Sequence, residues 1–379
     1  MKRFFLLVSL FGGISMSAQH SNVQSIFTQL ENLPSYYSEF LKEYTYDVNQ
    51  NLNQSFFYNL QTSAEVMDTG EFTIGLLMGG GMAFPPHDVD NQTSPLFTNE
   101  NLSLVNGEVP TLFNYQDETA IRFAFIDPSS GQEVVNPNDG SRVAFELAVP
   151  GGLGLGYIYV PSASISLGYG VGHGTEVRAY VLPKFGLAAG AAGTDFAISR
   201  DFAYGASVKH EITTWIPKLL NRGWHISADV AYSAMSASVE GAFLQDLESD
   251  LSAEFNDNYI VEVASALEGV DYDLSTYGTR LFVGKTFSWI ELSAFAGWMN
   301  NTYSMASIGS VNATLIDKSG NNPDTELVLE DFANFNGSNS NSFYGASFVL
   351  GKGWFRLNAA YTYTSTGGQF VSTGFNFYF

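Results

Sequence analysis

The chain has 379 residues, of which 14% are charged and 15% aromatic; it has no cysteine, and its formal net charge is −22. This is too little charge for an ordinary soluble enzyme, since soluble domains carry about 25% charged residues. The missing cysteines exclude disulfides, thiolate metal sites, cysteine nucleophiles and a lipid-modified cysteine, and the acidic balance argues against nucleic-acid partners.

The first residues have the pattern of a secretory signal. Lys2 and Arg3 form a basic start, an almost wholly apolar run follows over 4–14, and small residues lead up to Ala18. This predicts a signal peptide over 1–18. A membrane anchor is the alternative, but the run is too short to cross about 30 Å of hydrocarbon as a helix. No later stretch is long and apolar enough for a transmembrane helix.

The segment 19–65 has a different pattern from the rest of the chain. Apolar residues recur there at helical spacing, with Pro34 between two groups of them. They are Val23, Ile26, Phe27, Leu30, Leu33, Tyr37, Phe40, Leu41 and Tyr44. We expect one or two short amphipathic helices, which lie either in the periplasm or in the barrel mouth as a hatch.

The remainder, 66–379, alternates apolar and polar residues with period two, which is typical of strands with one lipid-facing side. In 224–234, for example, Trp224 and Val230 oppose His225 and Asp229. Ten strands are predicted, near 72–84, 157–171, 174–188, 201–210, 224–235, 274–286, 290–315, 342–351, 353–365 and 369–379. The stretch 85–156 adds two or four more if its apolar runs join the sheet. A helical insert is expected over 211–222.

The last strand alternates aromatic and polar residues and ends on Phe379. Phe375, Phe377 and Phe379 resemble the assembly signal that the barrel-assembly machinery reads in outer-membrane barrels. The predicted fold is therefore all-β: a transmembrane antiparallel up-and-down β-barrel of 10–14 strands with a short helical N-terminal segment, located in the outer membrane of a Gram-negative cell.

Placing the C-terminus in the periplasm predicts the side on which each connection lies. Tight turns such as Gly172–Gly174 then face the periplasm, and the long connections 85–156, 236–273 and 317–341 face outward, as in known barrels. Residues 246–273 hold nine acidic residues and no Lys or Arg. We interpret them as solvated outer loops rather than a calcium site, because no calcium-loop spacing is present. No metal or cofactor is predicted.

Charged residues predicted to line the lumen are few and balanced in sign. They are Glu176, Arg178, Asp201, Lys209, Asp229, Arg280, Glu291 and Arg356, together with His225. A wide porin would carry an uncompensated ring, so these residues favour a narrow interior of ion pairs over a selectivity filter. His225, Ser227 and Asp229 share a face, but same-face neighbours lie about 6.5–7 Å apart, too far for a triad. No hydrolase or phosphate-loop motif occurs, and we do not expect an enzyme.

Three stretches resemble one family: Gly205–Pro217, the hairpin Ser166–Arg178 and the terminal strand. This is an uncharacterised family of outer-membrane barrels with a domain of unknown function, and it is distantly similar to the long-chain fatty-acid transporter class. That class pairs a 14-stranded barrel with an N-terminal hatch. Family members tend to have Gly-Trp-Tyr before the first strand, where this chain has Ser55-Phe56-Phe57. The resemblance implies no catalytic residue.

Two functions follow from these features. The first is passive transport of a hydrophobic or amphipathic small molecule, with a candidate strand kink over 151–161. The second is a non-transporting structural or scaffold barrel whose acidic surface contacts partners or the lipopolysaccharide layer. Outer-membrane lipid and lipopolysaccharide are the expected surroundings in both cases.

Overall fold

The protein is described by a computed structural model, which defines residues 23–46, 54, 56–60, 62–83, 102–104, 119–127, 130–149, 158–191, 194–241, 251–329 and 334–379. The predicted signal peptide and most of the predicted kink over 151–161 lie outside these residues. None of the helices in the described ranges is long and apolar enough to cross a membrane.

Ten strands close into an antiparallel barrel, because β1 pairs with the last strand and β12 pairs with β14. In barrel order they are β1 (Phe72–Ala83), β7 (Ile158–Gly172), β8 (Thr175–Leu182), β11 (Ala203–Glu211), β12 (Trp224–Gly241), β14 (Tyr259–Phe287), β15 (Ile290–Asp317), β17 (Phe335–Lys352), β18 (Phe355–Thr364) and β19 (Gln369–Tyr378). All ten predicted strands are present. The barrel has ten strands, so the alternatives of twelve or fourteen strands are wrong. It has four strands fewer than the 14-stranded barrels of the fatty-acid transporter class.

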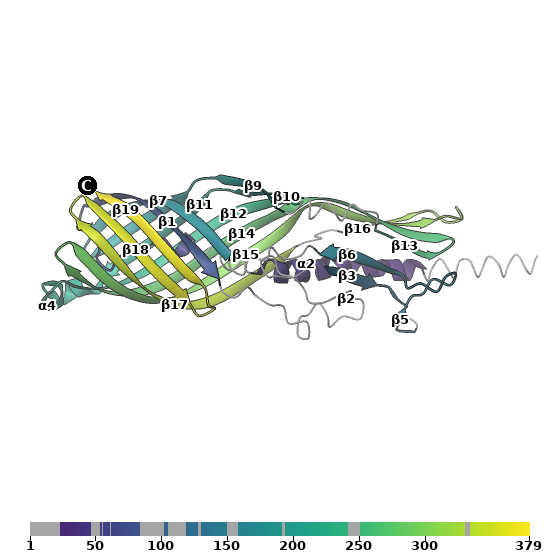
Figure 1. Ribbon diagram of the computed structural model, residues 1–379, viewed down its shortest axis with the longest axis horizontal. Coiled ribbons are helices and arrows are strands. Elements are labelled where there is room, and N and C mark those ends of the chain that lie inside the picture. The colour runs from purple at the N-terminus through teal and green to yellow at the C-terminus, as the bar shows by residue number, and fades with distance from the viewer. Residues whose placement is uncertain are drawn as a thin grey trace, which may run out of the picture.

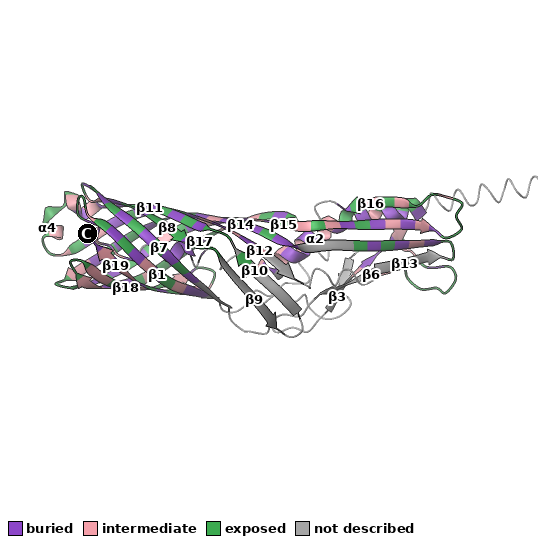
Figure 2. Cartoon of the chain, turned by 90° about the horizontal axis from the view of Figure 1, so that it is seen from above, coloured by how far each residue is buried: buried purple, intermediate pink, exposed green. Residues whose placement is uncertain are grey.

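The strands alternate as the sequence predicts. His225, Ser227 and Asp229 of β12 are buried in the interior, while Trp224 and Val230 are exposed on the outside. The other strands repeat this pattern, which Figure 2 shows as stripes of buried and exposed residues along the barrel. The outward apolar face and polar interior are those of an outer-membrane β-barrel, and the chain has this fold.

Exposed aromatic residues mark the two edges of this apolar band. One edge lies near the tight turns and includes Phe287 and Trp289; the other includes Tyr277 and Trp298, whose rings are in contact. Ten residues separate Tyr277 from Phe287 along β14, which matches the roughly 9–11 residues of a membrane-crossing strand. Beyond Tyr277 the outward residues become polar, beginning with Ser275 and Asp273. We call the two ends of the barrel the turn end and the far end.

Two barrel strands continue well past the far end. β14 has 29 residues and β15 has 28, so at about 3.4 Å per residue this pair is about 95 Å long. β13 (Leu251–Asn256) and β16 (Thr325–Leu329) pair with its outer part to form a four-stranded extension. Figure 1 shows the extension projecting far beyond the barrel.

This extension corrects the loop prediction for 236–273 and 317–341. Most of both stretches is strand, because their acidic and polar residues alternate with apolar ones. Glu262 is exposed, for instance, whereas Val261 and Val263 are buried. The charge count of this stretch concealed a period-two pattern, in which the described strand acids Glu262, Asp271 and Asp273 are all exposed. Its position at the far end agrees with the prediction.

A helical segment covers the inner face of the extension. Residues 23–27 are helical and continue into η1 (Thr28–Asn32) and α2 (Leu33–Tyr44), with Pro34 in the first turn of α2 where proline is tolerated. Its apolar residues, including Leu30 and Phe40, are buried against side chains such as Val261 and Leu315. The predicted helical N-terminal segment is therefore present, at the far end of the barrel.

A small sheet lies on the other side of this helical segment. It consists of β2 (Leu102–Leu104), β3 (Thr119–Ala124) and β6 (Ala144–Val149), with β4 (Ile126–Asp127) and β5 (Gln132–Glu133) forming a short ribbon. Tyr36 contacts Phe123 with ring centroids 6.2 Å apart, and Gln29 hydrogen-bonds both backbone groups of Ile126. The strand-like runs within 85–156 are thus strands, but they lie outside the barrel.

Two further elements complete the fold. β9 (Phe185–Ala191) and β10 (Thr194–Arg200) form a hairpin, and β10 pairs with the far-end part of β12. At the turn end, η3 (Ile212–Trp215) and α4 (Pro217–Leu220) form the predicted helical insert between β11 and β12.

Candidate functional site

The barrel interior is occupied by the chain's own N-terminal segment. Between α2 and β1, residues 56–60 and 62–68 run through the lumen, and most of their side chains are buried. We call these residues the plug. Because α2 lies at the far end and β1 begins at the turn end, the plug passes along the barrel from one end to the other.

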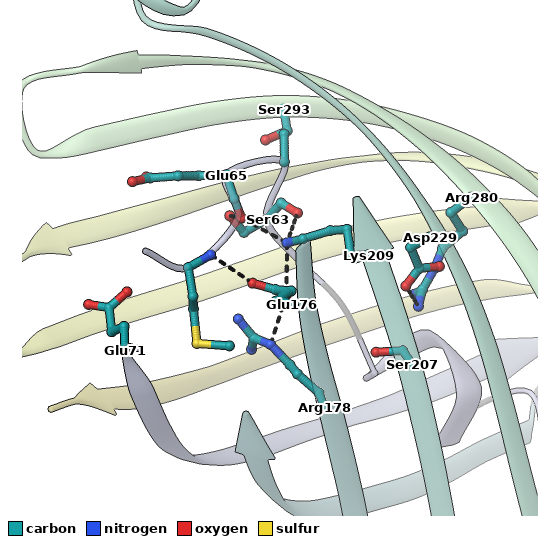
Figure 3. A network of polar contacts seen from close by, with 12 residues as sticks. Ser63, Glu65, Glu71, Glu176, Arg178, Ser207, Lys209, Asp229, Arg280 and Ser293 are labelled. Carbon is teal, nitrogen blue, oxygen red and sulfur yellow. Dashed lines mark hydrogen bonds and ion pairs between the residues drawn. The ribbon is translucent and has the colours of Figure 1, made fainter. Parts of the chain in front are cut away.

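Charged barrel residues bind the plug backbone directly (Figure 3). Lys209 on β11 donates through Nζ to the carbonyl oxygens of Ser63 at 3.0 Å and Glu65 at 2.7 Å. The same ammonium lies 3.1 Å from Oε1 of Glu176 on β8, whose Oε2 accepts the Met67 N–H at 2.9 Å. Arg178 completes this group with a 3.0 Å bond to Glu176. Buried backbone groups of the plug therefore find partners on the barrel wall.

A second carboxylate holds the plug from the opposite wall. Glu291 on β15 accepts the Ala64 N–H at 2.6 Å and the Ser63 hydroxyl at 2.8 Å. Arg356 on β18 binds the Glu65 carboxylate at 3.1 Å. Residues 63–67 are thus held by charges from four barrel strands, and we call this set of contacts the clamp. The clamp contains both signs, so the buried charges are paired.

Aromatic side chains fill the lumen above the clamp. Tyr58 packs against Phe343 and Phe370, with ring centroids 5.0 Å and 4.5 Å apart. The Arg280 guanidinium lies over the Phe57 ring, with its Cζ 5.1 Å from the ring centroid. Arg280 also pairs with Asp229 at 2.9 Å. This part of the interior is packed like a protein core and not lined like a water channel.

Glycines on the barrel wall give the plug the room it needs. A Cβ at Gly170 would lie 1.9 Å from the carbonyl oxygen of Asp68, and one at Gly284 would lie 2.7 Å from the Ala64 Cβ. Both distances are too short for any side chain. Gly170, Glu176 and Lys209 belong to the stretches that carry the family resemblance, so those stretches meet around the plug.

Most predicted lumen residues face the interior and engage the plug or one another. Glu176, Arg178, Lys209, Asp229, Arg280 and Glu291 are buried and bonded as described above, and Arg356 is partly buried. Asp201 is the exception. Its side chain is 60% exposed and pairs with Lys184 at 2.6 Å on the surface, because β11 begins only at Ala203, so period-two alternation does not extend back to Asp201.

The three residues of the conceivable triad are engaged elsewhere. His225 Nδ1 lies 2.8 Å from Glu211 Oε1, and Asp229 binds Arg280. No hydrogen bond joins Ser227, His225 and Asp229 among the described residues, and no group of three or more potential metal ligands occurs in that part of the chain.

The plug residues themselves were not predicted from the sequence. The helical spacing within 19–65 predicts a hatch there, whereas the residues in the lumen are mostly non-helical and reach Asp68. A usable signal was the run Phe56-Phe57-Tyr58, which has more aromatic surface than a solvated linker needs. The terminal aromatic residues Phe375 and Phe377 lie on the outward face of β19 and contact Phe355 and Trp354.

One open cavity lies outside the lumen, on the outward face just beyond the far aromatic edge. It has a volume of about 810 Å³ and is lined by Tyr204, Tyr232, Asp273, Thr302 and Ser338, among others. Its wall mixes aromatic and apolar side chains, such as Phe202 and Met235, with polar ones.

The whole chain, residues 1–379, matches the model of the family described as "Family of unknown function (DUF6588)", and the protein belongs to this family. No curated protein sequence matches it. Similar solved structures include the translocator domain of the autotransporter NalP from Neisseria meningitidis, at 9% identity and a TM-score of 0.35 over 90% of this chain and 99% of that one. A FadL homologue from Pseudomonas aeruginosa has 9% identity and a TM-score of 0.25 over 86% and 98% of the two chains.

Proposed function

We propose that this protein is a sealed outer-membrane barrel that anchors an elongated projection at the cell surface and does not conduct solutes. The clamp is the observation that carries the proposal. The plug backbone is part of the barrel's own hydrogen-bond network, through Lys209, Glu176 and Glu291. Withdrawing it would remove hydrogen bonds from Lys209, Glu176 and Glu291 and would separate Arg356 from Glu65. A buried group left without its hydrogen bond costs about 1–3 kcal/mol, and more when the group is charged.

The projection supports the display role. The chain continues two barrel strands far past the membrane-crossing band and extends its apolar core around the helical segment there. A simple channel needs no such structure. Short turns at one end and the long projection at the other match the usual asymmetry of outer-membrane barrels, which supports an outward orientation of the projection. In this proposal lipopolysaccharide surrounds the outward end, and the barrel-assembly machinery inserts the barrel.

Transport of a hydrophobic molecule is the alternative, and a locked plug distinguishes the two. The chain has no cysteine, so the pair Asn59→Cys and Ser162→Cys forms a single disulfide between the plug and β7, whose side chains are hydrogen-bonded at these positions. Vesicles containing the locked, the reduced and the unmodified protein are compared for uptake of a small sugar and a fluorescent fatty acid.

We expect no uptake above protein-free vesicles in any of the three samples. Uptake by the unmodified protein and by the reduced double variant, but not by the oxidised double variant, would show that the plug is a moving gate, and would overturn the proposal in favour of transport. The single variant Ser162→Cys is the matched control, since it changes the wall without locking the plug.

A further inference from the structure

Tryptophan and basic residues gather at the turn end of the barrel. Four of the five tryptophans, Trp215, Trp224, Trp289 and Trp354, flank the turns or lie in the helical insert, and all four are exposed. Trp215 is the most exposed of them, at 70%. Tryptophan favours the headgroup level of a membrane, because its ring is apolar and its N–H is polar.

Three bases lie among these rings. Lys285 on β14 pairs in register with Trp224, and its Nζ lies 5.1 Å from the centroid of that ring and 5.0 Å from that of Phe287. Lys218 and Arg222 are exposed on the insert between β11 and β12. We call Lys218, Arg222, Lys285, Trp215 and Trp224 the basic patch.

The insert is fixed against the barrel, so its bases are held near Lys285. The Thr286 N–H donates to the Gly223 carbonyl oxygen at 2.8 Å, and the turn before it is closed by a 2.8 Å bond from the Gly223 N–H to Leu220. Gly223 has a φ of +73°, and a Cβ there would lie 2.7 Å from the Thr286 carbonyl oxygen. Glycine is therefore required where the insert rejoins the sheet beside Lys285.

Acidic residues do not neutralise the patch. Glu211, which precedes the insert, is buried and bonded to Thr213 and His225. Among the ion pairs of the described residues, none includes Lys218, Arg222 or Lys285. In a chain with a net charge of −22, three bases that form no ion pair with a described residue lie beside exposed tryptophans and form a local site of opposite sign.

We propose that the basic patch binds the headgroup of an anionic phospholipid in the leaflet at the turn end. The three cations would contact the phosphate, while Trp215 and Trp224 lie at the glycerol level and Ile216, also exposed, reaches the acyl chains. The proposed orientation makes this the periplasmic leaflet, but binding itself does not depend on the orientation. An insert held at the membrane surface would fix the barrel's depth and rotation.

Quenching of tryptophan fluorescence by brominated lipid tests the site. The full-length protein is placed in phosphatidylcholine vesicles that contain the same fraction of either brominated phosphatidylglycerol or brominated phosphatidylcholine. We expect stronger quenching by the phosphatidylglycerol. In the variant Lys218→Gln/Arg222→Gln/Lys285→Gln the relative affinity should fall about fivefold per charge removed, or about 100-fold in total.

Two controls make the result decisive. The variant Lys184→Gln/Lys318→Gln removes exposed bases away from the patch and should keep the preference. Heat-dependent gel mobility checks that each barrel is folded, and the pair Lys218→Gln/Arg222→Gln, which changes exposed residues only, replaces the triple variant if that one fails to fold. Equal quenching by the two lipids in the unmodified protein, or a preference that survives in a folded patch variant, would overturn the proposal. Loss of the preference would leave the sealed-barrel function untouched, since that function is tested by uptake.

Discussion

Lys209 shows how a single buried charge can organise the lumen. Its ammonium is fully buried and holds two plug carbonyl oxygens as well as the Glu176 carboxylate. Glu176 in turn binds Arg178 and the Met67 N–H. Each residue in this group hydrogen-bonds or pairs with another member, and three of the bonds are to the plug backbone. The cost of desolvating these charges is therefore fully offset only while the plug is in place.

Replacing Lys209 should therefore destabilise the whole protein. We expect Lys209→Met to lower the free energy of unfolding by about 3–5 kcal/mol, because it breaks the buried ion pair with Glu176 and leaves two plug carbonyl oxygens without their donor. Urea unfolding followed by gel mobility measures this. Lys184→Met is the matched control, because Lys184 forms an exposed pair with Asp201 and should change stability by less than about 1 kcal/mol. Similar effects of the two variants would show that the clamp contributes little.

Asp317 ends β15 at the tip of the extension and illustrates a different use of a carboxylate. Its oxygens accept hydrogen bonds from Ser319 and from the backbone and side chain of Asn322, at 2.9 Å and 2.8 Å for the latter. These bonds favour the charged form and lower the pKa of Asp317 to about 2. The carboxylate therefore organises the tip at neutral pH.

The lowered pKa of Asp317 makes the stability of the extension tip depend on pH. A lowered pKa in the folded protein contributes stability above the ordinary aspartate pKa of about 3.9, and this is lost as the pH falls towards 2. In spectra of protein with ¹³C-labelled aspartate carboxyls, one resonance should titrate near pH 2 and disappear in Asp317→Asn. Titration of that resonance near pH 4 would contradict the hydrogen-bonded tip.

The protein consists of regular strands and a plug that is mostly irregular. Only the strands have a repeating sequence pattern. Period-two alternation located every barrel strand, because lipid outside and polar lumen inside impose it on each one. It also gave most of the lumen residues, such as Glu176 and Arg280. The plug has no such period. Its conformation is set by partners far apart in sequence, such as Glu291 for Ala64, and no local pattern encodes those contacts.

Contacts between residues far apart in sequence also explain why the acidic stretch 246–273 was wrongly predicted to be a loop. Residues around Glu262 are strand because their apolar partners cover the helical segment 23–44, which is distant in sequence. Without that cover, a row of Val and Tyr residues on a projecting sheet would be an exposed hydrophobic face. The helical segment and the extension are therefore expected to be stable only together.

A variant of the helical segment tests this dependence. Leu30 is fully buried in η1, and Leu30→Asp places a charge in that core. We expect the extension to become sensitive to trypsin or V8 protease, while heat-dependent gel mobility shows an intact barrel. Glu31→Asp changes the exposed neighbouring residue and should leave the extension resistant. Loss of the barrel in Leu30→Asp would mean that the two parts unfold as one unit.

The buried apolar core of the molecule has two regions, one on each side of the far edge of the membrane-crossing band. In the lumen region the plug packs against the barrel, and in the far-end region the helical segment packs against the extension. The plug follows α2 and precedes β1 in the chain, so the N-terminal part of the chain contributes to both regions. The N-terminal segment is thereby carried through the barrel to the end opposite Phe379.

Cysteine labelling of cells tests this arrangement. Asn321→Cys lies at the extension tip, Glu31→Cys in the helical segment and Lys352→Cys in a tight turn at the opposite end, and all three positions are exposed. Because the chain has no other cysteine, a membrane-impermeant maleimide reports one site at a time. We expect Asn321→Cys and Glu31→Cys to react in intact cells, and Lys352→Cys only after the outer membrane is permeabilised. The reverse pattern would place the projection in the periplasm, and labelling of Asn321→Cys without Glu31→Cys would show that the helical segment does not accompany the extension to the surface.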